Sequence, residues 1–179
     1  MTLLRRWPTA LGLVTIVAGL LVLPRDAESF GPAVAAMGGV YLLAYAVGIP
    51  WFAWPGFVII TAVTVVAQIF RDTVDPAVTL AVVMLLLWLA AVIRRRWTDR
   101  RTFVVQTGGL VVFAVIAMMC SAVRPGLGLA LAGVGWLAHG AWDAYHFARN
   151  SVVDRPWSEF CAVVDLGVGG ALLIAALAP

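Results

Sequence analysis

The chain has 179 residues, of which 63% are hydrophobic and 12% are charged, and its formal net charge is +3. Its mean hydropathy of +1.01 lies outside the range of soluble globular domains. The composition therefore predicts an all-α, polytopic membrane protein in which residues 1–179 form a single transmembrane domain. A separate enzyme domain outside the bilayer is excluded, because no region has the mixed polar composition of a soluble domain.

Seven apolar runs predict seven membrane-spanning helices, since most are close to the length of about 20 residues that a bilayer core requires. The runs cover residues 8–23, 31–49, 54–70, 76–93, 102–122, 126–148 and 157–178. Two prolines and a glycine in residues 49–56 favour a tight reversal between the second and third runs. The first run follows Arg5 and Arg6 in the manner of a secretory signal, and we expect it to remain as an uncleaved helix.

All twelve basic residues are arginine, and their placement predicts the orientation of the chain. A cytoplasmic N-terminus puts on the inner side Arg5, Arg6, the five arginines of residues 94–101, Arg149 and Arg155. The outer side then keeps Arg25, Arg71 and Arg124, as the positive-inside rule requires. We therefore expect a multi-pass protein of the cell's inner membrane, with membrane lipid and not nucleic acid as a partner. Its oligomeric state is not predicted.

Tryptophans support this orientation. The residues that fall at predicted inner helix ends, where an interfacial aromatic belt would place them, are Trp7, Trp51, Trp54, Trp97 and Trp157. The two cysteines, Cys120 and Cys161, lie in different apolar runs near opposite faces of the membrane, so no disulfide is expected between them.

Polar residues gather between Trp136 and Asp165, a stretch that holds both histidines and four of the nine acidic residues. His139, Asp143 and His146 are spaced by four and then three positions, which places them on one face of a helix. If the last two helices form a hairpin turning near residue 152, His139 and Asp165 lie at the same depth, near the middle of the bilayer. An ionisable group at that depth costs at least about 2.5–3.5 kcal/mol, so it should face the bundle and have a partner.

Three functional interpretations and one structural interpretation remain open for this stretch. The first is acid and base chemistry on a lipid or isoprenoid substrate, with Asp165 and His139 as the central pair and Asp143 orienting the histidine. The second is a small carrier that relays protons through the buried carboxylates. The structural one is an accessory membrane protein whose polar residues hold helices in register.

The third functional interpretation is a metal site built from His139, Asp143, His146 and Asp165, whose donor atoms suit zinc, iron or manganese. The spacing weakens it, because residues seven apart on a helix are separated by about 10.5 Å along the axis. We therefore assign no metal ligand and no cofactor from the sequence. We favour an intramembrane acid/base enzyme with a hydrophobic small molecule as its substrate, and the proposed catalytic residues are His139, Asp143 and Asp165.

Further polar and aromatic residues are candidates for substrate binding, because they fall in the inner half of the predicted helices. They are Tyr41, Tyr45, Thr61, Thr64, Gln106, Trp142, Tyr145, His146 and Glu159. Each residue type also forms ordinary helix-packing hydrogen bonds. No nucleophile elbow, phosphate-binding loop, dinucleotide fingerprint or paired CxxC motif occurs in the sequence.

The segments HGAWDAYH at residues 139–146 and FCAVVD at residues 160–165 resemble the sequences of small uncharacterised multi-pass membrane proteins of actinobacteria. The resemblance covers roughly residues 134–170 and implies no function. Seven helices with intramembrane histidine and aspartate also look like the alkaline ceramidase and adiponectin receptor superfamily. That family uses three histidines, whereas this chain has two on one predicted helix. Membrane terpene cyclases are similar in size and in their buried carboxylates, without a matching motif.

Overall fold

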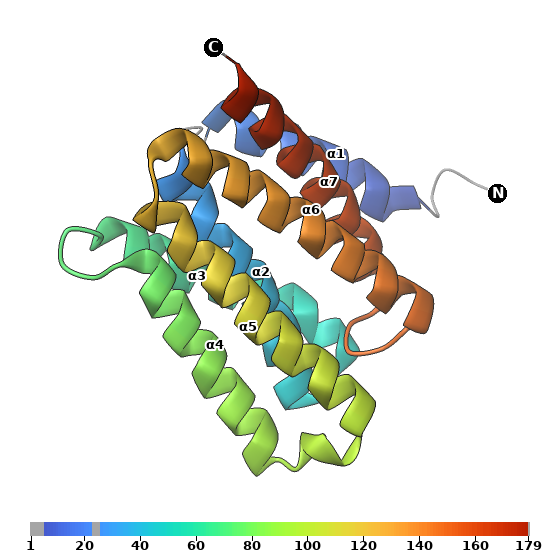
Figure 1. The fold of residues 1–179 in the computed structure, drawn as a ribbon. Coiled ribbons are helices and arrows are strands. Elements are labelled where there is room, and N and C mark those ends of the chain that lie inside the picture. Colours follow the sequence, from blue (N-terminus) through green and yellow to red (C-terminus); the bar gives the residue numbers. More distant parts are fainter. Residues whose placement is uncertain (1–5, 23–25, 179) are drawn as a thin grey trace.

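The computed structural model describes residues 6–22 and 26–178, and in these ranges the chain is helical and contains no β-strand (Figure 1). Each apolar run of the sequence forms one α-helix. The helices are α1 Trp7–Val22, α2 Ala27–Val47, α3 Ala53–Ile69, α4 Pro76–Ile93, α5 Arg100–Ala122, α6 Pro125–Arg149 and α7 Arg155–Leu177, with short 3-10 helices η2 Pro50–Phe52 and η3 Arg96–Thr98. The all-α prediction is confirmed. Arg5 and Arg25 of the topology argument lie outside the described residues.

Aspartates begin four of the helices. Asp26, Asp75, Asp99 and Asp154 each accept hydrogen bonds from backbone N–H groups in the first turn of α2, α4, α5 and α7. Those N–H groups have no partner within the helix, so a side-chain oxygen at this position stabilises the helix start. Hydrogen bonds from the Thr102 side chain and backbone lower the pKa of Asp99. These four acidic residues are thus accounted for by helix capping.

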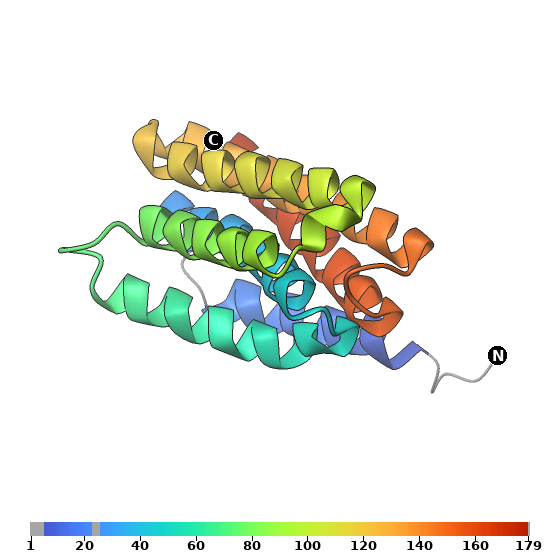
Figure 2. The same ribbon diagram turned by 90° about the horizontal axis from the view of Figure 1, so that it is seen from below.

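Helix α2 is the centre of the bundle. It packs against α3, α4, α5 and α6, while α1 lies on the outside and rests mainly on α7 (Figure 2). Of the membrane-length stretch Ser29–Val47 in α2, 72% is buried, against 22% for Pro76–Ile93 in α4. Helix α4 thus exposes most of its apolar side chains, as a helix that faces lipid does.

Five helices are long and apolar enough to cross a membrane: α2, α3 together with η2, α4, α5 and α7. The chain is therefore a helical protein with several apolar helices suited to the bilayer. Among the helices described, α1 is apolar but shorter, and α6 falls outside the five although it has 25 residues. His139, Asp143 and Arg149 lie on α6 and lower its hydropathy.

The aromatic belt is only partly as expected. Trp7, Trp51 and Trp97 are exposed, whereas Trp157 is only 1% exposed. Its ring packs against Trp54, Phe57 and Phe160, at centroid distances of 4.9–5.6 Å. Trp157 therefore lies at the start of α7, as predicted, but its ring belongs to the core and does not project from the surface as the other three do. The two cysteines are buried free thiols, as expected.

Candidate functional site

The last two helices form the predicted hairpin, and their contact is the most extensive between any two described helices. Helix α6 ends where Asn150 takes a left-handed conformation with φ 48°, and Asp154 caps the start of α7. Between them Val152 has φ 73°, a conformation that is costly for a β-branched residue. This short, constrained turn sets which residues of α6 and α7 lie opposite each other.

Two glycines allow the helices of this hairpin to approach closely. A Cβ atom on Gly169 would lie 2.9 Å from the carbonyl oxygen of Gly133, and one on Gly133 would lie 3.1 Å from the carbonyl oxygen of Gly169. Small residues at such a crossing let two helix backbones come together in the membrane. The close approach brings side chains of α6 within hydrogen-bond distance of α7.

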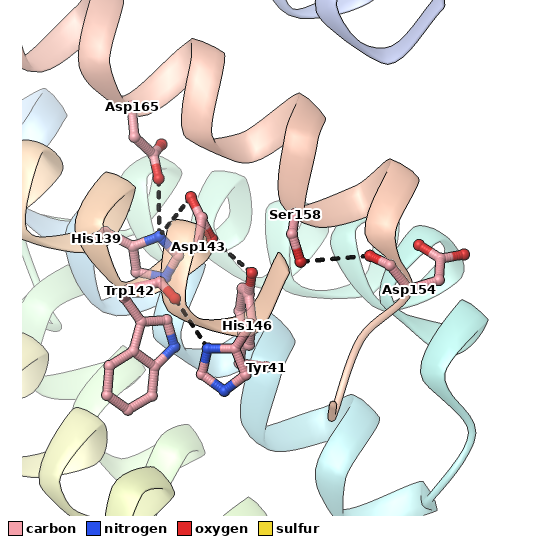
Figure 3. Close-up of polar contacts among 8 residues, drawn as sticks. All are labelled: Tyr41, His139, Trp142, Asp143, His146, Asp154, Ser158 and Asp165. Carbon is pink, nitrogen blue, oxygen red and sulfur yellow. Dashed lines mark hydrogen bonds and ion pairs between the residues drawn. The ribbon is translucent and has the colours of Figure 1, made fainter. Parts of the chain in front are cut away.

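The polar cluster of the site consists of His139, Asp143, Asp165 and Tyr41 (Figure 3). His139 Nδ1 lies 2.7 Å from Asp165 Oδ2 and 3.5 Å from Asp143 Oδ2. The Tyr41 hydroxyl of α2 donates to Asp143 Oδ1 at 2.5 Å. The three catalytic candidates are brought together, and the prediction that His139 meets Asp165 at one depth is confirmed.

This cluster is shielded from solvent, since its four side chains have exposures between 0% and 1%. Two carboxylates face a single imidazole nitrogen, and no arginine pairs with either of them in the described ranges. Asp143 Oδ2 and His139 Nε2 have no hydrogen-bond partner among the described residues. With both carboxylates ionised and the imidazole protonated, the cluster carries one uncompensated negative charge, which a low-dielectric interior strongly disfavours.

The second histidine is not part of this cluster. His146 Nδ1 lies 2.9 Å from the Trp142 carbonyl oxygen, which can only accept, so this nitrogen carries the proton. Its Nε2 lies 3.0 Å from the Gln106 side-chain nitrogen and accepts from it. His146 is thus a neutral, fully paired side chain. The four-ligand metal set that included it is wrong, because both of its nitrogens are used elsewhere.

An apolar crevice of about 530 Å³ reaches the cluster at Asp165. It lies among α1, α2, α3 and α7, with Trp136 of α6 also contributing. Phe57, Trp157 and Phe160 line it towards the starts of α3 and α7. The residues lining the opposite end are Ser29, Gln68 and Arg71, and those along the walls include Ala33, Ala36, Met37, Val40, Ile60, Thr61 and Thr64. A carboxylate therefore meets a space whose walls are mostly hydrocarbon.

The other substrate-binding candidates lie in several places. Thr61 and Thr64 line the crevice, although the Thr64 hydroxyl bonds to the Ile60 carbonyl of its own helix. Tyr41 belongs to the polar cluster. Gln106 pairs with His146, and Trp142 and Tyr145 pack their rings against that histidine at centroid distances of 4.9 and 5.2 Å.

Two candidates lie away from the cluster. The Tyr45 hydroxyl donates to the Arg96 carbonyl in the loop before α5. Glu159 accepts from the Thr9 hydroxyl at 2.5 Å and from Arg6 at 3.3 Å, so it ties α7 to α1. Apart from Thr61 and Thr64, the sequence did not indicate the crevice walls, because small apolar residues on lipid-facing and cavity-facing surfaces look alike.

No family model, no curated protein and no solved structure matches this chain. The resemblance of residues 134–170 to small actinobacterial membrane proteins therefore stays a prediction, and function has to be argued from the cluster and the crevice.

Proposed function

We propose that the chain is an inner-membrane protein that binds a lipid or isoprenoid molecule in the crevice and transfers a proton to or from it at Asp165. One observation carries this proposal: Asp165 lines a crevice of about 530 Å³ with mostly apolar walls, and its carboxylate is hydrogen-bonded to His139. Apolar pockets with a few convergent polar groups are typical of sites for small hydrophobic ligands.

The residues around Asp165 suit acid and base work. A protonated Asp165 would give its proton to an atom of the bound molecule, and the His139 N–H at 2.7 Å would stabilise the carboxylate that remains. The reverse transfer returns the proton to Asp165. Tyr41 fixes Asp143 through its hydroxyl, and Asp143 lies beside the imidazole at 3.5 Å, so these two side chains orient His139.

The membrane topology of the proposal has seven spans and a cytoplasmic N-terminus. The arginine-rich segment 94–101 between α4 and α5 supports this orientation. Helix α6 supports the seventh span through its partners, since α2 and α7 provide hydrogen-bonding groups for Asp143 and His139. A polar helix that satisfies its ionisable groups inside the bundle is compatible with the bilayer.

The test is to identify what copurifies with the protein in mild detergent. Lipid extraction and mass spectrometry should find one enriched apolar molecule with the wild-type chain. Ala36→Phe, which places a ring inside the crevice, should lose this molecule, while Ala10→Phe on the exposed side of α1 should retain it. Asp165→Asn should still bind the molecule but should no longer convert it, because the amide cannot transfer the proton. Equal lipid content in both phenylalanine variants would refute ligand binding in the crevice.

A structural role is the second candidate, because the same hydrogen bonds join three helices. Tyr41 of α2 bonds Asp143 of α6, and His139 of α6 bonds Asp165 of α7. If the cluster serves assembly alone, no molecule is enriched, and Asp165→Asn changes only the stability of the bundle. The extraction experiment therefore separates the two functions.

A further inference from the structure

We propose that His139, Asp143 and Asp165 bind one divalent transition-metal ion, each through a single atom. Such an ion would take the place of the proton between His139 and Asp165, so the inference concerns the cluster described above but does not depend on a lipid in the crevice. Imidazole with two carboxylates is a donor set that suits zinc, manganese and iron.

The geometry of the three donor atoms supports a shared ion. One nitrogen or oxygen from each residue lies within 4.8 Å of the other two. The separations of 2.7 and 3.5 Å from His139 Nδ1 bracket the roughly 3.4 Å expected between ligands placed about 2.1 Å from a tetrahedral metal. Coordination would require side-chain rotations that adjust these separations, the largest of which is no more than 4.8 Å.

Charge balance points to a dication. Two carboxylates and a neutral imidazole have a net charge of minus two, so one divalent ion makes the buried cluster neutral. A second proton would also balance a cluster with a protonated imidazole. An ion would in addition coordinate Asp143 Oδ2, which has no hydrogen-bond partner in the described part of the chain, together with the donor atoms of His139 and Asp165.

The surroundings of the cluster resemble the support that metal ligands receive in proteins. The Tyr41 hydroxyl holds Asp143 Oδ1 at 2.5 Å, which leaves Oδ2 facing His139. Hydrogen bonds of this kind orient a ligating carboxylate. Asp165 lines the crevice, so an ion on these residues lies close to the space where a ligand would bind. A coordination position open to that space is typical of a catalytic metal, not a structural one.

The first measurement is the metal content of the protein purified in detergent through an affinity tag without histidines. Mass spectrometry of the elements, after passage over a chelating resin, should give about one zinc, manganese or iron per chain. His139→Gln, Asp143→Asn and Asp165→Asn should each lower the content about tenfold or more. The matched controls His146→Gln and Glu159→Asn should keep it, since their side chains bond elsewhere on the same two helices.

Folding of each variant is checked by circular dichroism and gel filtration. If the three cluster variants do not fold, the wild-type protein decides the question through Co²⁺ titration, which should give visible absorption bands that Zn²⁺ abolishes. Absence of these bands from folded wild-type protein, or equal metal content in Asp165→Asn and Glu159→Asn, would overturn the inference.

Ligand binding in the crevice and metal binding by the cluster can be tested separately, whereas a bound ion would replace the proton transfer at Asp165. Protein without metal that still holds an apolar molecule, lost in Ala36→Phe, supports the crevice and refutes the ion. Protein with one ion and no enriched molecule supports the ion and refutes the lipid.

Discussion

The two histidines of α6 lie seven positions apart on one helix face, and their surroundings differ completely. His146 has two neutral partners, the Trp142 carbonyl and the Gln106 amide, and each of its nitrogens is satisfied. His139 faces two carboxylates with one nitrogen, and its other nitrogen has no partner among the described residues. Spacing along a helix gives both histidines the same orientation. Only the neighbouring helices show that one has neutral partners and the other faces two carboxylates.

The largest difference in unfolding free energy is expected between the two variants that each remove one imidazole. His139→Ala leaves Asp143 and Asp165 buried without their common partner, and breaking such a pair costs about 3–5 kcal/mol of unfolding free energy. His146→Ala leaves the Gln106 amide unpaired at a cost of about 1–3 kcal/mol. Unfolding in detergent by heat or SDS measures both. A smaller loss for His139→Ala than for His146→Ala would show that the carboxylates do not depend on the imidazole.

The tyrosines of α2 offer the next comparison. Tyr41→Phe removes the hydrogen bond to Asp143, and bonds to charged groups contribute about 1.5–3 kcal/mol. Tyr45→Phe removes a bond to the neutral Arg96 carbonyl, which contributes about 0.5–1.5 kcal/mol. The same unfolding experiment ranks the two variants. Equal losses would mean that the Asp143 carboxylate is not charged when Tyr41 binds it.

Adjacent glycines of α7 test whether close helix packing holds Asp165 on His139. Gly169→Ala puts a Cβ atom 2.9 Å from the backbone of α6 and should cost about 1–3 kcal/mol through overpacking. Gly170→Ala meets no atom within 4 Å among the described residues, so we expect a change within about 1 kcal/mol. If Gly169→Ala is as stable as wild type, the hairpin tolerates a wider separation than the structure has.

The smallest effect is expected when both partners of the neutral pair are replaced together. His146→Phe with Gln106→Leu removes donor and acceptor at once, and such a double replacement is often nearly neutral, within about 1 kcal/mol. His146→Phe alone leaves Gln106 unpaired and should cost more. A double variant that unfolds as easily as the single one would show that His146 does more for stability than pair with Gln106.

Local patterns predicted much of this arrangement. The apolar runs predicted the seven helices. His139 and Asp165 are equally far from a turn near residue 152, and this predicted their pairing, because residues at equal distances from the turn lie opposite each other in a hairpin of two straight helices. The sequence could not show that Tyr41 bonds Asp143, since 102 positions separate them and only the packing of α2 against α6 joins them. The position of His146 and the burial of Trp157 depended on the same unpredictable contacts between helices.

The polarity of α6 has a consequence for its retention in the bilayer. This helix is not among the five that are apolar enough to cross a membrane on their own properties. Its buried Asp143 and His139 form hydrogen bonds with α2, which precedes it in the chain, and α7, which follows it. In the seven-span topology proposed above, we therefore expect α6 to be held in the bilayer more firmly with α7 beside it than without α7.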